Sequence, residues 1–470
     1  MRLRRSLRPR RPACNFLMAT TGTLSNPMRR RRAAAPRLTA ILLGSALFAS
    51  CASVAHYEPI DDAVSRGDYG AGYAMIQEAK DSAYPPRNRI LYALDAGMLA
   101  HYAGEWNAAE THLRDAELGI EAAFTKSVTL EASTYLVNDN TQEYPGEDYE
   151  DIYLNVFNAL NYYHEGSVVD ALVEIRRIDN KLKFLSTKYG TMITNAQKAV
   201  LDKSGEIPYD PTAMTSNFSN SALAQYLGML FYRAEGKNDD ARINRDQVKL
   251  AFANQPAMYP FALPASLDDE LSIPAGKARL NVMSFNGPSP AKIENATRLQ
   301  FSDMHWIKFA LPAMQSRPSR IAKTEVAIDG GETFVLEQIE DMGAVAEETF
   351  KLRSGLIYLK SVLRSIAKTT ASVALDKQSN DAGSAEGAIL LGVLSLGTQI
   401  YAEASEQADL RMARYFPARA VVGGINLEPG TYSFTVNYYD ASGMAVDRRR
   451  FENVEVRPNR LNLTEAVCIQ

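Results

Sequence analysis

The stretch that decides the fold runs from Glu143 to Gly166 and reads EYPGEDYEDIYLNVFNALNYYHEG. Its first half contains five carboxylates: Glu143, Glu147, Asp148, Glu150 and Asp151. Its second half repeats apolar residues at helical spacing. Carboxylates are favourable at the positive end of a helix dipole. We therefore predict a helix with Gly146 in the turn before it, Asp148 as its N-cap and Asp151 in its first turn.

Carboxylates this dense could instead form a catalytic or metal-binding cluster. A calcium loop needs ligands spaced around the ion, and the EF-hand pattern is absent. We therefore interpret the cluster as mainly structural. Glu147 and Glu150 remain unassigned at the helix end. If they have a role, we expect pairing with Arg176 or Arg177 on the next helix rather than catalysis.

The same helix-turn pattern recurs between residues 57 and 255, around four turn glycines: Gly67, Gly104, Gly166 and Gly236. Five residues after each glycine stands a small residue: Gly72, Ala109, Ala171 and Ala241. This resembles the tetratricopeptide (TPR) pattern, in which small residues let paired helices approach closely and glycine ends the first helix in a left-handed conformation. The glycines are 37, 62 and 70 residues apart, so we expect TPR-like hairpins with insertions near 125–148 and 183–220. A generic helical bundle with glycine turns is the alternative.

The TPR resemblance implies an inner groove lined by the first helix of each pair. The residues at the matching positions are Met98, His101, Tyr102, Leu160, Tyr163, His164, Tyr226, Leu230 and Arg233. A neighbouring tyrosine and histidine occupy the same register twice, which would suit an extended peptide or a helix through stacking and hydrogen bonds. Alternatively, the chain's own insertions cover these side chains.

From about residue 263 the pattern changes to short alternating runs typical of strands. The segment TEVAIDGGETFVLEQIED predicts two strands joined by a turn at Asp329-Gly330-Gly331. Two apolar seams within residues 343–410 predict an antiparallel helical hairpin inserted between β-rich parts at 263–342 and 411–470. We therefore expect a multi-domain α+β chain, with a TPR-like domain at 51–262 followed by a β-sandwich-like domain that carries this hairpin.

The second seam of the hairpin contains an uncharged run of 16 residues, Gly387–Ala402, which is too short to span a bilayer. We interpret it as a packed helix. A peripheral dip into a membrane, or a docking helix, is the alternative.

The N-terminal segment 1–50 reads as a targeting region. From Met28, which is an equally good start, the sequence MRRRRAAAPRLTAILLGSALFASC has a basic part, a short apolar part and small residues before Cys51. The end of this segment resembles a bacterial lipobox, although Phe48 departs from the usual pattern. The resemblance implies cleavage before Cys51, lipidation of Cys51 with acyl chains such as palmitate, and, with Ala52 following, anchoring in the outer membrane on the periplasmic face. An ordinary signal peptide that contains a cysteine is the alternative.

Charge and composition exclude several classes of function. Without residues 1–50 the chain has 40 basic and 55 acidic residues, a net charge of −15, which disfavours nucleic acid as a partner. The three cysteines, Cys14, Cys51 and Cys468, offer no disulfide framework and no CxxC metal site. No nucleotide, dinucleotide, HExxH or GxSxG motif is present, so we expect no cofactor, no metal and no catalytic residues.

Three blocks, YPGEDYE, NALNYYHEG and DALVEIRRIDNKL, resemble a family of bacterial envelope lipoproteins with TPR-like N-terminal halves. The segments NGPSPAKIE, ADLRMARYFPAR and LEPGTYSF resemble the C-terminal half of that family. The resemblance implies a cell-envelope lipoprotein and brings no catalytic residues.

Together these features predict a lipid-anchored scaffold or adaptor for envelope assembly, which binds an envelope protein or peptide in the TPR-like groove. An enzyme or carrier acting on envelope glycans or lipids is one alternative. A structural component of a secretion or pore complex is another.

Overall fold

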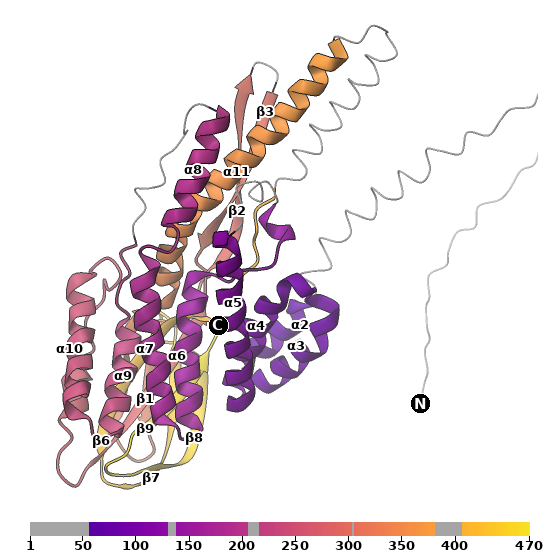
Figure 1. The fold of residues 1–470 in the computed structure, drawn as a ribbon. Helices are drawn as coiled ribbons and strands as arrows, with labels where there is room; N and C mark the ends of the chain where they lie inside the picture. The colour runs from indigo at the N-terminus through magenta and orange to yellow at the C-terminus, as the bar shows by residue number, and fades with distance from the viewer. Residues whose placement is uncertain (1–55, 130–137, 205–215, 303–304, 381–406) are drawn as a thin grey trace, which may run out of the picture. The chain divides into compact units, whose positions relative to one another are not determined.

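A computed structural model describes residues 56–129, 138–204, 216–302, 305–380 and 407–470 (Figure 1). All of them belong to one compact unit, Val54–Gln470. The chain is a mixed helix and sheet protein of the α+β class, as the sequence predicts. The targeting region and Cys51 lie outside the described residues.

Helices that follow one another along the N-terminal half pack in pairs. The pairs are α2 (Tyr57–Ser65) with α3 (Tyr69–Ala83), α4 (Arg89–Tyr102) with α5 (Trp106–Thr129), α6 (Asp148–His164) with α7 (Val168–Leu185), and α9 (Ala222–Ala234) with α10 (Asn238–Asn254). Short 3₁₀ turns lie at η1 (Pro86–Asn88), η3 (Asp139–Thr141) and η5 (Ala265–Leu271). The four predicted turn glycines have φ values of 74°, 79°, 86° and 69°. The left-handed helix ends are therefore confirmed, since glycine adopts this conformation at little cost.

Small residues bring the paired helices close together. Ala109, Ala171 and Ala241 are fully buried. A methyl group on Gly97 would come within 2.6 Å of the Leu113 side chain on the paired helix. The close packing therefore depends on small residues, both at the predicted alanines and at Gly97.

Seven strands form one sheet in the order β8-β7-β4-β5-β6-β1-β9. Their bounds are β1 (Ala278–Pro288), β4 (Lys323–Ile328), β5 (Thr333–Asp341), β6 (Pro417–Leu427), β7 (Gly430–Tyr439), β8 (Ala445–Val456) and β9 (Asn462–Cys468). The neighbours are antiparallel, except that β9 runs parallel to β1. The predicted turn at Gly330 joins β4 to β5, and Gly331 N donates to Ile328 O at 3.0 Å.

The expectation of two sheets packed face to face is wrong. The two edges of the single sheet approach each other, and Arg449 Nε in β8 donates to Val467 O in β9 at 3.1 Å. Fully buried side chains from different strands fill the space inside, among them Val282, Phe434 and Tyr438. Alternation along a strand shows that one face is buried, but the same alternation suits a sandwich and a curled single sheet.

A second group of elements lies beside the sheet. The strands β2 (Ala291–Ser302) and β3 (His305–Gln315) form a separate hairpin. The hairpin packs through β3 on the long α11 (Met342–Asn380), which also packs on α8 (Gly190–Ser204) (Figure 1). Side chains of α8 and α11 form their own apolar cluster, in which Ala196 and Leu359 are fully buried.

Helix α11 begins where the first arm of the predicted helical hairpin does. The second arm, with Gly387–Ala402, lies in 381–406, outside the described residues. Across the ranges that the structure describes, no helix combines the length and the apolar character needed to cross a bilayer.

The helices and the sheet share one hydrophobic core. Phe157 of α6 contacts Phe285 of β1, with ring centroids 4.8 Å apart, and also Phe416, at 5.9 Å. All three rings are fully buried. Residues on both sides of the predicted boundary at 262–263 therefore contribute to the same core.

Candidate functional site

The residues predicted to line a groove lie on α4, α6 and α9, on the face that meets the chain's own C-terminal part. Met98, Leu160 and Leu230 are fully buried in the shared core. Tyr102 donates its hydroxyl to Tyr415 O at 2.9 Å. In the next helix pair, Tyr163 donates to Leu461 O at 3.1 Å and accepts from Leu463 N at 3.0 Å. Both tyrosines therefore bind extended backbone, but that backbone belongs to the same chain.

The two histidines of the repeated register converge on one buried carboxylate, Glu465 of β9. His101 Nε2 lies 3.2 Å from Glu465 Oε2, and His164 Nε2 contacts Oε1. His101 Nδ1 lies 2.7 Å from Asn161 Oδ1, so both ring nitrogens of His101 face acceptor oxygens. Trp106 stacks on His164 at 4.1 Å.

Glu465 is held as an anion by this arrangement. Burial alone would raise the pKa of its carboxyl, but the charges and hydrogen bonds of His101 and His164 outweigh burial and lower the pKa to about 2. Through His101 on α4 and His164 on α6, Glu465 therefore binds β9 to helices of two different pairs.

The last pair of predicted groove residues contacts strand β1 and the turn before it. Arg233 Nη1 lies 2.7 Å from Glu270 Oε2, and Arg233 Nη2 donates to Asn281 Oδ1 at 2.8 Å. Tyr226 donates to Glu270 Oε1 at 3.3 Å. Arg279 also pairs with Glu270, at 2.9 Å, so the buried carboxylate has two cationic partners.

A second extended segment, residues 408–416, crosses the helices. Ala413 N donates to Glu150 Oε1 at 2.7 Å, and Arg414 N donates to Asp95 Oδ1 at 2.7 Å. The expectation that these helices present an open groove is therefore wrong at the predicted residues. At Tyr102 and Tyr163 the bound group is backbone of the chain itself, in this segment and around β9.

The start of α6 differs in detail from the prediction. The N-cap is Glu147, and Asp148 is the first helical residue. Asp148 pairs with Lys188 at 2.7 Å and accepts from the Tyr189 hydroxyl at 2.9 Å. Gly146 has a φ of 76°, as a turn glycine requires, and Asp151 lies in the first turn.

Glu147 and Glu150 do not pair with Arg176 or Arg177, so that expectation is wrong. Glu150 accepts from Glu147 N at 2.8 Å, which is one half of a capping box. It also accepts from the Tyr144 hydroxyl at 2.8 Å. Burial, and then the charge of Glu147, raise the pKa of Glu150 to about 7.

Glu147 instead binds two cations from the C-terminal half. Lys292 of β2 contacts Glu147 Oε1, and Arg353 of α11 lies 2.8 Å from the same oxygen. Arg177 pairs with Glu117 at 2.5 Å. The sequence alone did not indicate Lys292 and Arg353 as partners of Glu147. They follow it by 145 and 206 residues, and no local pattern connects residues so far apart along the chain.

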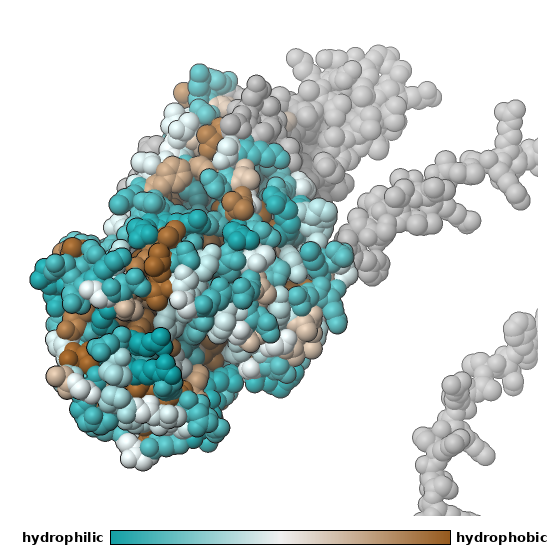
Figure 2. All heavy atoms as spheres, turned by 60° about the horizontal axis from the view of Figure 1, so that its bottom comes forward, coloured by the Kyte–Doolittle hydropathy of each residue, from teal (hydrophilic) through white to brown (hydrophobic). Residues whose placement is uncertain are grey.

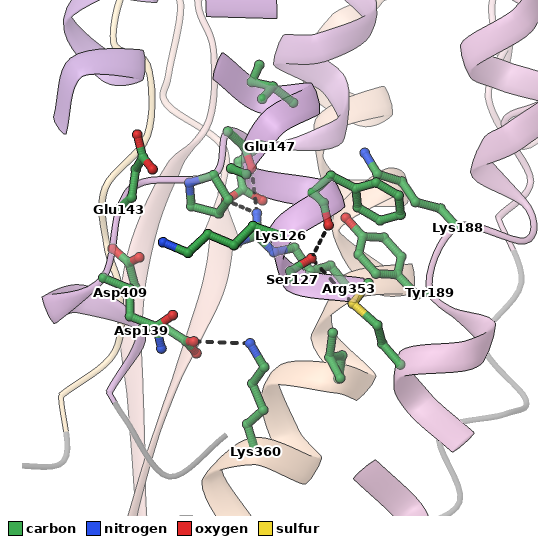
Figure 3. A pocket seen from close by; sticks show the side chains of 18 residues that line it. Lys126, Ser127, Asp139, Glu143, Glu147, Lys188, Tyr189, Arg353, Lys360 and Asp409 are labelled. Carbon is green, nitrogen blue, oxygen red and sulfur yellow. Dashed lines mark hydrogen bonds and ion pairs between the residues drawn. The ribbon is translucent and has the colours of Figure 1, made fainter. Parts of the chain in front are cut away.

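A cavity of about 240 Å³ opens beside this turn, between α5, α8 and α11 (Figure 3). One wall is apolar and consists of Ile120, Ala123, Phe124, Met192 and Leu356. The rim is charged, and Figure 3 shows Glu143, Asp139 and Asp409 on one side with Lys188 and Tyr189 on the other. An apolar wall with a few polar groups is typical of a ligand-binding cavity.

Arg353 reaches this cavity in a fixed orientation. Its Nη1 donates to Gly146 O at 2.6 Å and to Glu147 Oε1 at 2.8 Å. Among the described residues its Nε and Nη2 have no hydrogen-bond partner, and the side chain is 17% exposed. One edge of the guanidinium is therefore held by the protein, while the other makes no hydrogen bond within the described part of the chain.

Metal and thiol chemistry find little support in the described ranges. There, no three His, Cys, Asp or Glu side chains gather closely enough to hold a metal ion. Cys468 is a buried free thiol, and burial raises its pKa to about 12, which keeps it protonated at neutral pH.

Among the described residues, exposed apolar side chains do not mark a further site. Figure 2 shows one face, on which hydrophobic residues form a short stripe and isolated spots among hydrophilic ones. The large apolar residues exposed by more than half lie on separate elements: Leu118, Val169, Ile243 and Met444. Single exposed apolar side chains are normal on soluble surfaces.

Comparisons of this chain with protein-family models, with curated proteins and with solved structures found no match.

Proposed function

We propose that the protein is a lipid-anchored scaffold of the cell envelope that binds a partner protein at the cavity between α5, α8 and α11. The observation that carries a binding role is this open cavity with its apolar wall and charged rim. By contrast, the buried carboxylates Glu465, Glu270 and Glu340 each accept several bonds from within the chain. Such saturated groups suit structure better than proton transfer to a substrate.

We propose that the helix pairs are TPR-like. The left-handed φ of the four turn glycines and the buried alanines after them support this. In this proposal the concave face that other arrays would offer to a partner binds the chain's own segments. We therefore propose that the partner binds at the cavity and not on the concave face of the helix pairs.

We propose outer-membrane anchoring through Cys51, on the periplasmic face, because the targeting segment resembles a lipobox signal. Cells fed labelled palmitate should label the protein, and Cys51→Ser should abolish the label. Continued labelling of the variant would refute the anchor. Correct export of Cys51→Ser with a secretory leader would show that folding itself does not need lipid.

Photocrosslinking in cells tests whether a partner protein binds at the cavity. A photoreactive amino acid at Lys126, on the cavity rim, should capture a defined envelope protein in vivo. The same group at Ile243, which is 53% exposed on α10 and distant in the repeat array, is the matched control. Equal products at both positions, or none at Lys126, would contradict the proposal.

The carrier alternative requires an apolar pocket in the β half. Its interior is filled by Phe434, Val436 and Tyr438, all fully buried, which speaks against that location. The docking alternative, a part of a secretion or pore complex, draws support from the packing of α11 on α8 and β3. Replacing Gly387–Ala402 by a polar linker should abolish assembly in that case and leave the crosslink at Lys126 unchanged in ours.

A further inference from the structure

We infer that the cavity binds a carboxylate carried by an apolar group, and that the partner's C-terminal residue supplies both. This rests on the proposed function and names the part of the partner that is bound. The observation that carries it is that Arg353, with Nε and Nη2 unbonded within the described chain, lines the same cavity as the apolar wall of α5, α8 and α11.

Arg353 is prepared for a bidentate contact. Gly146 O and Glu147 Oε1 hold one nitrogen of the guanidinium, so its plane is fixed before any ligand arrives. The remaining Nε and Nη2 form the kind of fork that matches the two oxygens of a carboxylate. A fixed fork loses little conformational freedom on binding.

The local charge admits an anion. Glu147 is shared by Lys292 and Arg353, so one carboxylate faces two cations. The other lining carboxylates also have cationic partners within the described chain: Asp139 with Lys360, Glu143 with Arg89 and Asp409 with Arg411. An incoming carboxylate therefore meets acids whose charge is already compensated.

The size and the wall fit an apolar side chain. The cavity of about 240 Å³ exceeds the roughly 150 Å³ that accepts benzene in an apolar protein cavity. Phe124, Met192 and Leu356 provide the surface against which such a side chain would pack. Lys188 lies over the Phe124 ring at 5.2 Å, and its charge is paired with Asp148.

The carboxylate could come from a polypeptide C-terminus or from a small free acid, and titration calorimetry of the full-length protein separates the two. The probes are N-acetyl-Gly-Gly-Leu with a free C-terminus, the same peptide as its C-terminal amide, and 4-methylpentanoate. We expect the free peptide to bind at least tenfold more tightly than the amide and than 4-methylpentanoate. Equal binding of 4-methylpentanoate would assign the site to a small acid and overturn the C-terminal assignment. Absence of binding by both acids would overturn the whole inference.

Two variants test the assigned groups. Arg353→Lys keeps a charge beside Glu147 but loses the fork, so the preference for the acid over the amide should fall about tenfold. Ala123→Trp fills the cavity from its half-buried wall and should abolish binding. Leu118→Trp, on the same helix but 57% exposed and outside the cavity, should bind as the wild type does.

The melting temperature of each variant reports whether it is folded. Equal binding by Ala123→Trp and Leu118→Trp would overturn the inference even if Arg353→Lys fails to fold. Peptide binding without a crosslinked partner at Lys126 would count against the proposed function alone. A crosslinked partner without peptide binding would count against the inference alone.

Discussion

At the scale of single residues, Gly146 shows how one position combines two constraints. Its φ of 76° is left-handed, and an added methyl group would lie 2.7 Å from Ile120 Cγ1. Gly166 has a similar φ of 86°, but a methyl group added there would have no other residue beyond its chain neighbours within 4 Å. Alanine substitutions at Gly146 and Gly166 therefore separate the energetic cost of backbone strain from the cost of overpacking.

We expect Gly166→Ala to lower the free energy of unfolding by about 1 kcal/mol, the cost of a left-handed alanine. Gly146→Ala should cost about 1–3 kcal/mol more, because Ile120 is buried and must shift. Urea denaturation of both variants measures the difference. Equal losses would mean that the Ile120 contact has no energetic weight.

The lowered pKa of Glu465 predicts how the stability of the protein depends on pH. Its pKa is lowered to about 2 in the fold, so the native state binds fewer protons than the unfolded state between about pH 4.5 and pH 2. Its contribution is fully present above pH 4.5 and is lost as the pH falls toward 2. Glu465→Gln should therefore be less stable than the wild type at pH 7, with the gap closing as the pH falls through this window.

Melting temperatures at pH 2.5 to 7 test this. Glu452→Gln, on the neighbouring strand β8, is the control, since that side chain is 67% exposed and should shift stability by less than about 0.5 kcal/mol. A gap between Glu465→Gln and the wild type that stays constant with pH would contradict the assignment of Glu465 as the buried anion.

At the scale of elements, α8 and the middle of α11 pack through a cluster separate from the main core. Leu359 is fully buried in it. Leu359→Ala should cost about 2–4 kcal/mol locally, because the cavity left behind adds to the lost burial. Hydrogen exchange should speed up in α8, while β1 amides in the main core keep their protection.

The control for α8 is Leu201→Ala, since Leu201 is 47% exposed on the same helix and should change exchange little. Equal acceleration in α8 and β1 for Leu359→Ala would show that the two clusters unfold together.

The elements also show what a sequence can predict. The glycine turns, the hairpin at Gly330 and the first arm at α11 follow from local chemistry, and the structure has them where that chemistry indicates. Strand β9 was missed, because NLTEAVC is short, carries Glu465 in its middle and pairs with β1 about 180 residues away. A parallel partner that distant leaves no local signal.

The candidate site follows the same rule. Tyrosine and histidine in a repeated register favoured an extended ligand, and Tyr102 and Tyr163 bind extended backbone of the same chain. Which extended segment they bind depends on Glu465 and on the backbone around Arg414, and only the tertiary fold brings these to the helices. The cavity at Arg353 needs α5, α8 and α11 together, so no single motif could mark it.

At the scale of the whole molecule, buried polar bridges join the helices to the C-terminal part. Glu465, Glu150 and Asp95 each bind groups more than 250 residues away. Removing one partner leaves a buried charge or hydrogen-bonding group uncompensated, which costs several kcal/mol. The helical part and the strands therefore stabilise each other and should unfold together.

This coupling predicts that residues 54–262 cannot reach their native state alone. Without the strands, Phe157 and the buried ring of Tyr153 would face water, and His101 and His164 would lose Glu465. We expect the full chain to unfold in one calorimetric transition, and the fragment 54–262 to bind a hydrophobic dye and to melt without cooperativity. Mixing it with residues 263–470 should restore cooperativity if the two fragments find each other, since all the bridges then re-form. A fragment that melts cooperatively near the temperature of the full chain would refute the coupling and would show that the helical array folds as an independent domain.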